Sequence, residues 1–251
     1  ALFDYQHPEL SECERLQGSD LWVLCYRVPS GWRAGYVVTE FHGEGEPPWR
    51  RPDDRHAARR AALAGGADPL NPIRAAQMMS AEPISVVEVP DAPEHPFATA
   101  PGGAAPELRL IRDEQTGQER RVWMYTPQAN RNGVVGVDDA PLLILFDGQV
   151  WATRASLADM LDRAIASGVV PPLYVVMIDS VDPEQRSREL GINGGVNDFV
   201  VDTLIPLMRA EFPVTHDPRR TLVSGQSFGG LASLWLLGRA PHLVGAAIAQ
   251  S

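Results

Sequence analysis

Residues 221–231 read TLVSGQSFGGL, and this stretch decides the fold. Its first residues are apolar or β-branched, which is typical of a buried strand, and an apolar helical segment follows as far as Arg239. The five residues between them match G-x-S-x-G, the sharp strand-to-helix turn that presents a strained serine. Gly225 and Gly229 are needed because a Cβ at either position would clash across the turn. We therefore predict that Ser227 is a nucleophile.

Strands and helices alternate around this turn. Continuous apolar runs between amphipathic helices predict a mainly parallel sheet that is covered on both faces. The predicted strands are Leu142–Phe146, Leu173–Ile178, Thr221–Val223 and Val244–Ala249, and the predicted helices are about Trp151–Ser167, Asn197–Glu211 and Phe228–Arg239. A hairpin, Glu107–Arg112 with Glu119–Tyr125, precedes them around a turn at Gln115-Thr116-Gly117.

The N-terminal part has a different pattern. Short stretches rich in aromatic and β-branched residues predict strands at Ser19–Tyr26, Gly31–Glu40 and Ile84–Val89, with a loop leading into a short helix between them. A segment rich in Pro, Ala and Gly, Pro90–Pro106, has the composition of a linker. The predicted fold class is α/β: residues 1–99 form a small all-β, sandwich-like domain and residues 106–251 an α/β-hydrolase domain, C-terminally incomplete.

An ester-cleaving serine needs donors for the oxyanion of the tetrahedral intermediate. The backbone N–H of Phe228 supplies one donor, and the loop after an earlier strand supplies the other in this fold. Gly148 and Gln149 follow the strand Leu142–Phe146, where that loop is expected. We predict an oxyanion hole formed by Phe228, Gly148 and Gln149.

Serine also needs a base, for which histidine is usual. Four of the six histidines lie in the N-terminal part or the linker, and His216 and His242 flank the elbow strand and helix at the end opposite Ser227. Since the chain order in this fold is Ser, acid, His, both partners are expected beyond Ser251.

A charged segment, Arg186-Ser187-Arg188-Glu189-Leu190, follows the strand that ends at Ile178. It falls on the carboxyl side of the sheet, where open α/β sheets bind ligands. Arginines there suit an anionic or aromatic substrate, although the segment is equally compatible with a solvated loop.

Charge and composition exclude several other classes. The net charge of −10 disfavours nucleic-acid binding. Two cysteines form no disulfide framework or zinc motif, and no apolar stretch approaches a membrane span. Together with the lack of a signal peptide, these features predict a cytoplasmic protein without a bound metal or cofactor and without a membrane partner. The sequence does not indicate the oligomeric state.

Several of these motifs together resemble the iron-enterobactin (enterochelin) esterase family. The resemblance rests on GSDLW (18–22), GWRAGY (31–36), DPLNP (68–72), LILFDGQVW (143–151), the Arg186…Glu189-Leu190…Asn193 pattern and SGQSFGGL (224–231). It implies a cytosolic esterase that opens the ester (trilactone) backbone of ferric catecholate siderophores, with iron arriving in the substrate. It further implies that Ser227 is the nucleophile and that Arg186, with Arg188 and Trp151, contacts the substrate.

Two alternatives stay open at this point. The same fold hosts esterases for feruloyl or acetyl sugars, and a chain without its histidine would be a non-catalytic binder.

Overall fold

The computed structural model describes residues 7–50, 53–76, 82–95, 105–128, 138–192 and 194–250. Most of the predicted linker, Asn193 and Ser251 therefore lie outside the described residues. The chain separates into two compact units, residues 1–94 and 95–251.

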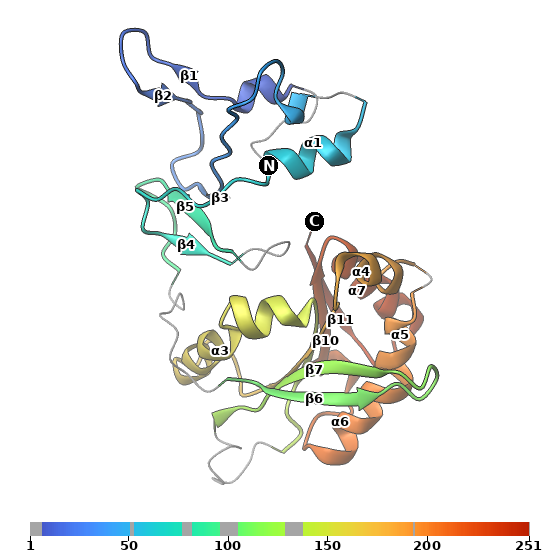
Figure 1. The fold of residues 1–251 in the computed structure, drawn as a ribbon. Helices are drawn as coiled ribbons and strands as arrows, with labels where there is room; N and C mark the ends of the chain where they lie inside the picture. The colour runs from blue at the N-terminus through green and yellow to red at the C-terminus, as the bar shows by residue number, and fades with distance from the viewer. Residues whose placement is uncertain are drawn as a thin grey trace. The chain divides into compact units, whose positions relative to one another are not determined.

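The N-terminal unit consists of short antiparallel strands and short helices (Figure 1). Strands β1 and β2 form one pair, and β3, β5 and β4 form a three-stranded sheet in that order. The predicted strands are present but shorter than predicted. The elements are η1 (Pro8–Ser11), β1 (Glu14–Arg15), β2 (Trp22–Val23), β3 (Arg33–Tyr36), η2 (Pro48–Arg50), α1 (Arg55–Ala62), β4 (Arg74–Ala75) and β5 (Ile84–Glu88).

The DPLNP stretch ties a loop of this unit to its sheet. Asp68 accepts a hydrogen bond from the Tyr36 hydroxyl at 2.7 Å, and Asn71 donates to the Val86 carbonyl at 2.7 Å. The Tyr36 hydroxyl and the Leu70 backbone N–H lower the pKa of Asp68 below its ordinary value. The stretch therefore has a structural role within this unit.

The second unit has the predicted α/β-hydrolase architecture around one six-stranded sheet (Figure 1). The strand order is β11-β10-β8-β9-β7-β6, with β11, β10, β8 and β9 parallel and the β6–β7 hairpin antiparallel. The strands are β6 (Glu107–Arg112), β7 (Glu119–Tyr125), β8 (Leu142–Phe146), β9 (Tyr174–Ile178), β10 (Thr221–Gln226) and β11 (Ala246–Gln250). The helical segments are η3 (Val150–Arg154), α3 (Leu157–Ala166), α4 (Pro183–Glu189), α5 (Val196–Phe199), η4 (Val200–Leu204), α6 (Ile205–Glu211), η5 (Pro218–Arg220) and α7 (Phe228–Arg239).

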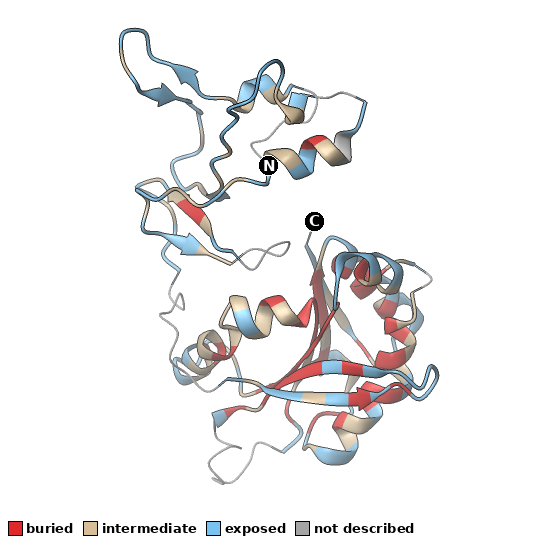
Figure 2. Cartoon of the chain, viewed as in Figure 1, coloured by how far each residue is buried: buried red, intermediate tan, exposed pale blue. Residues whose placement is uncertain are grey.

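Both faces of the central strands β8 and β9 are buried, whereas the edge strands β6 and β11 are largely exposed (Figure 2). Along β8 successive side chains alternate, so that Ile144 and Phe146 pack against α5, α6 and α7, whereas Leu145 packs against α3. This double burial explains why the central strands are continuous apolar runs.

Two helical predictions need correction. The segment predicted as one helix from Trp151 to Ser167 is a π-helical turn, η3, followed by α3, and residues 196–211 likewise contain a π-helical turn between α5 and α6. The charged segment at 186–190 is not a loop, because it belongs to helix α4 and its following residue. The Asp182 side chain caps α4 by accepting from the Gln185 backbone N–H, and Pro183 occupies its first turn.

No helix in the described part of the chain is long and apolar enough to cross a membrane.

A buried ion-pair network closes the β6–β7 turn. Asp113, 1% exposed, accepts from the Arg120 side chain at 3.0 Å and from the backbone N–H groups of Gln115 and Thr116. Burial alone would raise the pKa of Asp113, but these donors outweigh burial and hold the pKa below its ordinary value. Arg120 also contacts Glu189 of α4 at 2.9 Å.

Asp113→Asn is expected to lower the free energy of unfolding at pH 7 by about 3 kcal/mol, because it leaves buried Arg120 with one carboxylate. A carboxyl whose pKa is lowered by folding stabilises the protein above its unfolded pKa of about 3.9, and this stabilisation is lost as pH falls through the lower folded pKa. The deficit, measured by urea unfolding, should therefore shrink towards pH 3. Asp139→Asn, at an exposed carboxylate that pairs with Arg220, is the control and should cost less than about 1 kcal/mol. A deficit for Asp113→Asn that is equal at both pH values would contradict the linkage.

Candidate active site

Ser227 lies between the end of β10 and the start of α7. Its backbone is strained, with φ 54° and ψ −117°, and the residue is exposed. Its own N–H donates to the Gln250 carbonyl of β11 at 2.7 Å, which fixes the turn from the neighbouring strand. The N-terminus of α7 directly follows the serine, so negative charge developing in front of it is stabilised. These are the features of a nucleophile elbow.

The glycines around Ser227 allow strand and helix to approach closely. A Cβ on Gly225 would lie 2.5 Å from the carbonyl carbon of Gly229. A Cβ on Gly229 would lie 3.3 Å from both a carboxylate oxygen of Asp147 and the Cβ of Phe146. The predicted clash across the turn is therefore found at Gly225, whereas a Cβ at Gly229 would instead make a tight contact with the end of β8 and Asp147.

The loop after β8 begins with Asp147, which is 1% exposed and has φ 59°. Gly148 follows it, buried against the backbone of β9, where a Cβ would lie 2.4 Å from Met177. The Gln149 side chain accepts from the Ser180 backbone N–H at 3.2 Å, so this loop is also tied to the segment after β9. Gly148 and Gln149 thus follow the carboxyl end of the strand beside β10, and their role as oxyanion donors stays a prediction.

The strand register brings these loops together. Phe146, the last residue of β8, pairs with Ile178, the last residue of β9, while Leu145 pairs with Ser224 of β10. Each of the three neighbouring strands is followed by a non-glycine residue with positive φ: Asp147 after β8, Val181 after β9 and Ser227 after β10. Such conformations cost energy and are concentrated at functional sites. In the described part of the chain, three of the five non-glycine residues with positive φ therefore follow neighbouring strands at this edge, and the other two are Asp139 and Ser156.

The predicted substrate contacts occupy different environments. Arg186 is buried and pairs with Asp147, the Arg188 side chain is 66% exposed, and the Trp151 indole is half-buried and donates to the Phe146 carbonyl at 3.0 Å. Of these three, Arg188 is the one whose charge lies open to solvent. Asp147 and Ser180, which the motif analysis did not assign, lie with Arg186 in one buried polar cluster. The sequence signal that could have indicated this cluster is an acidic residue, Asp147, directly after an apolar strand.

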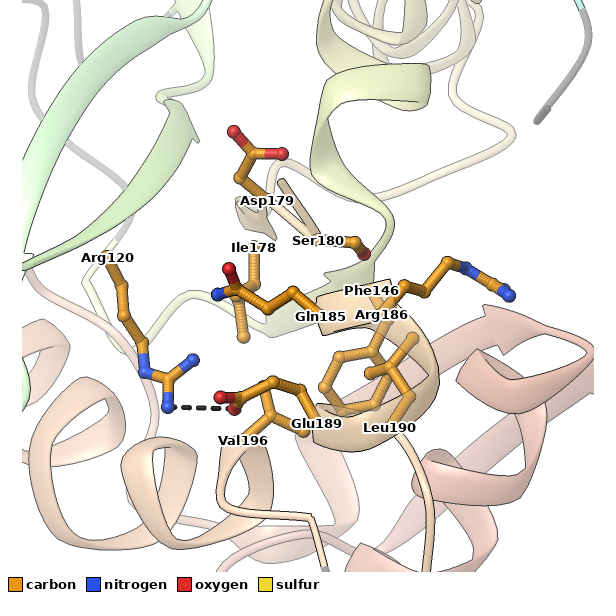
Figure 3. A pocket seen from close by; sticks show the side chains of 10 residues that line it. All are labelled: Arg120, Phe146, Ile178, Asp179, Ser180, Gln185, Arg186, Glu189, Leu190 and Val196. Atoms are coloured by element: carbon orange, nitrogen blue, oxygen red, sulfur yellow. Dashed lines mark ion pairs between the residues drawn. The ribbon is translucent and has the colours of Figure 1, made fainter. Parts of the chain in front are cut away.

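A small cavity lies beside this cluster (Figure 3). Its volume is about 10 Å³, enough for roughly one water molecule. Arg120 and Glu189, joined by their ion pair, line one side of it (Figure 3). A cavity of this size is too small for an organic substrate of Ser227.

His216 and His242 both lie at the opposite edge. His216 precedes η5, which leads into the start of β10, and His242 lies between α7 and the start of β11. Since β10 and β11 are parallel, both histidines are at the amino ends of their strands. Neither is placed to receive the proton of Ser227.

Each of the two units matches a known family model. A family model described as "Enterochelin esterase, N-terminal" matches residues 1–98, and one described as "Putative esterase" matches residues 114–251. An iron(III) enterobactin esterase of Yersinia enterocolitica is 32% identical over 243 residues, which cover 90% of this chain and 67% of that protein. This chain belongs to the enterochelin esterase family.

Other members extend the comparison. An iron(III) enterobactin esterase of Dickeya dadantii is 30% identical over 267 residues, covering 99% of this chain and 59% of the relative. Among solved structures, a ferric enterobactin esterase from Salmonella typhimurium superposes with a TM-score of 0.76 at 30% identity, covering 95% of this chain and 61% of that one. The enterobactin esterase from Shigella flexneri, determined in the presence of enterobactin, gives 0.73 at 30% identity, covering 93% and 60%. The chain spans about 60% of the length of these enterochelin esterases.

Proposed function

We propose that this chain carries the nucleophile of a serine esterase that hydrolyses the ester backbone of ferric catecholate siderophores such as enterobactin. The observation that carries the proposal is the strained, exposed Ser227 at the strand-to-helix turn, beside the loop after β8. Family membership supports the substrate class. The Shigella flexneri relative was crystallised with enterobactin and with 2,3-dihydroxy-N-benzoyl-serine, and another relative is named iron(III) salmochelin esterase.

The proposed reaction is acyl transfer. The Ser227 Oγ attacks an ester carbonyl of the siderophore, and its proton passes to a base. The backbone N–H of Phe228 and those of Gly148 and Gln149 bind the oxyanion of the tetrahedral intermediate, while the positive end of α7 adds to its stabilisation. Collapse of the intermediate expels the alcohol of the neighbouring serine unit and leaves an acyl-enzyme. Water then releases the linear product and restores Ser227.

Charge and aromatic surface are consistent with this substrate. A ferric triscatecholate is a bulky trianion, and the exposed Arg188 guanidinium on α4, which forms only a long 3.9 Å surface ion pair with Glu184, supplies positive charge. In the N-terminal unit Trp22 is 65% exposed, and aromatic surface of this kind stacks on catechol rings. We propose that the N-terminal unit assists in holding the substrate. We also propose that iron enters as part of the substrate rather than as a resident cofactor, and that the protein works in the cytoplasm.

The test is hydrolysis of ferric enterobactin by the protein expressed from the complete reading frame, followed by mass spectrometry. Linear 2,3-dihydroxybenzoyl-serine products are expected, with none from Ser227→Ala. p-Nitrophenyl acetate serves as a small neutral substrate in parallel. Cleavage of p-nitrophenyl acetate with ferric enterobactin left intact would sink the siderophore hypothesis and favour an esterase for other acyl groups.

A further inference from the structure

Arg186 is an unusual arginine, because its side chain is buried although it belongs to a charged helix at the protein surface. The residue is 9% exposed, whereas Arg188 on the same helix has a side chain that is 66% exposed. In Figure 3 the Arg186 side chain extends away from Arg120 and Glu189. A charge taken out of water in this way needs specific partners to be tolerated.

Those partners come from the loop after β8 and from the end of β10. Its Nε donates to Asp147 Oδ1 at 2.6 Å and one Nη donates to Asp147 Oδ2 at 2.9 Å, a bidentate pair. The same Nη donates to the Gln226 carbonyl at 3.0 Å, one residue before the nucleophile. The guanidinium carbon also lies 6.0 Å from the centre of the Phe228 ring. Arg186 thus joins the start of the β8 loop to the elbow.

Both ends of this connection are held firmly. Asp147 also accepts from the Ser180 hydroxyl at 2.6 Å, so three donors fix a carboxylate whose backbone is strained. Helix α4, which carries Arg186, is capped by Asp182 at its start and contacts Arg120 through Glu189 at its end. A braced helix with a planar, forked side chain sets the spacing of the groups it contacts more narrowly than a flexible surface residue does.

We propose that Arg186 is a positioning residue, which holds the oxyanion donors of the β8 loop and of the elbow at a fixed separation. The inference rests on the proposed function, in which Ser227 attacks an ester and the β8 loop and the elbow supply the oxyanion donors. An oxyanion hole works through donors already placed where charge develops, and a misplacement of about 1 Å can cost roughly 100-fold in rate. In this role Arg186 acts through Asp147, Gln226 and Phe228 and does not touch the substrate.

The test compares Arg186→Lys with the parent, both expressed from the complete reading frame, on p-nitrophenyl acetate and on ferric enterobactin. Lysine keeps a positive charge opposite Asp147 but cannot form the bidentate pair and reach the Gln226 carbonyl together. A positioning role predicts that kcat falls by about 10- to 100-fold on both substrates, with KM little changed. A substrate-contacting role predicts a higher KM for the anionic siderophore and no change with the neutral ester, and that result would overturn the proposal.

Two further variants keep the result interpretable. Arg109→Lys alters another ion-paired arginine, which lies on β6 and contacts Glu107, Glu211 and the Phe212 ring. This variant should leave kcat unchanged. If Arg186→Lys does not fold, the double variant Arg186→Gln/Asp147→Asn removes both charges together and should show the same loss of kcat. Parent-like kcat in a folded variant would refute the role. A parent that cleaves p-nitrophenyl acetate but not ferric enterobactin would refute the proposed substrate and leave this comparison valid.

Discussion

Ser227→Ala is expected to reduce ester hydrolysis by about 10⁶-fold in kcat, to the limit of detection. The reason is chemical: without the Oγ no acyl-enzyme forms, and the donors around the empty position provide only a small residual rate. Fold stability should change little, because Ser227 is exposed and its backbone N–H, not its side chain, holds the turn through the Gln250 carbonyl. Steady-state rates on p-nitrophenyl acetate and ferric enterobactin measure the loss.

Covalent labelling separates a lost nucleophile from a damaged fold. The parent should gain one fluorophosphonate adduct by intact mass, and peptide mapping should place it on Ser227, while Ser227→Ala should gain none. Ser167→Ala is the matched control, since its hydroxyl caps α3 by donating to the Ala164 carbonyl, and it should label as the parent does. Full labelling of Ser227→Ala would show that a different residue is the nucleophile.

The elbow could be predicted from sequence because everything that defines it is local. A β-branched strand, two glycines at fixed spacing and an apolar helix lie within 19 consecutive residues, from Thr221 to Arg239. The parallel sheet was equally accessible, since strands buried on both faces must be continuously apolar. The family model over residues 114–251 and the strand order agree with that prediction.

Helix α4 shows what local reasoning misses. The start signals were present, with Asp182 at the cap and Pro183 after it, but the segment was interpreted as a charged loop at the ligand-binding edge of the sheet. Asp147, which pairs with the buried Arg186, lies 39 positions earlier, directly after β8, the strand next to β9. A sequence pattern does not reveal a partner that distant, so the arginine was assigned to the substrate from its place after the strand and from the family resemblance.

Gly225→Ala is expected to lower the free energy of unfolding by about 4 kcal/mol or more, within the range reserved for steric clashes in packed regions. Gly225 has no positive φ, so the cost is one of space. The added methyl would lie 2.5 Å from the carbonyl carbon and 2.7 Å from the Cα of Gly229, both backbone atoms that no rotamer change can move. β10 and α7 would have to separate, and the angle at Ser227 would change with them. Urea unfolding measures the stability loss, and the fluorophosphonate labelling rate should fall in parallel.

Gly238→Ala is the matched control on the helix that follows the elbow. No atom lies within 4 Å of the position a Cβ would occupy at Gly238, and alanine is favoured over glycine inside a helix by about 1 kcal/mol. This variant should therefore be slightly more stable than the parent and label at the parent's rate. The two changes add the same methyl group to the same strand–helix unit, so their opposite signs isolate the close approach at the elbow. If Gly225→Ala unfolds at the parent's urea concentration, the turn can widen without cost, and close packing of the glycines does not hold Ser227 in its strained conformation.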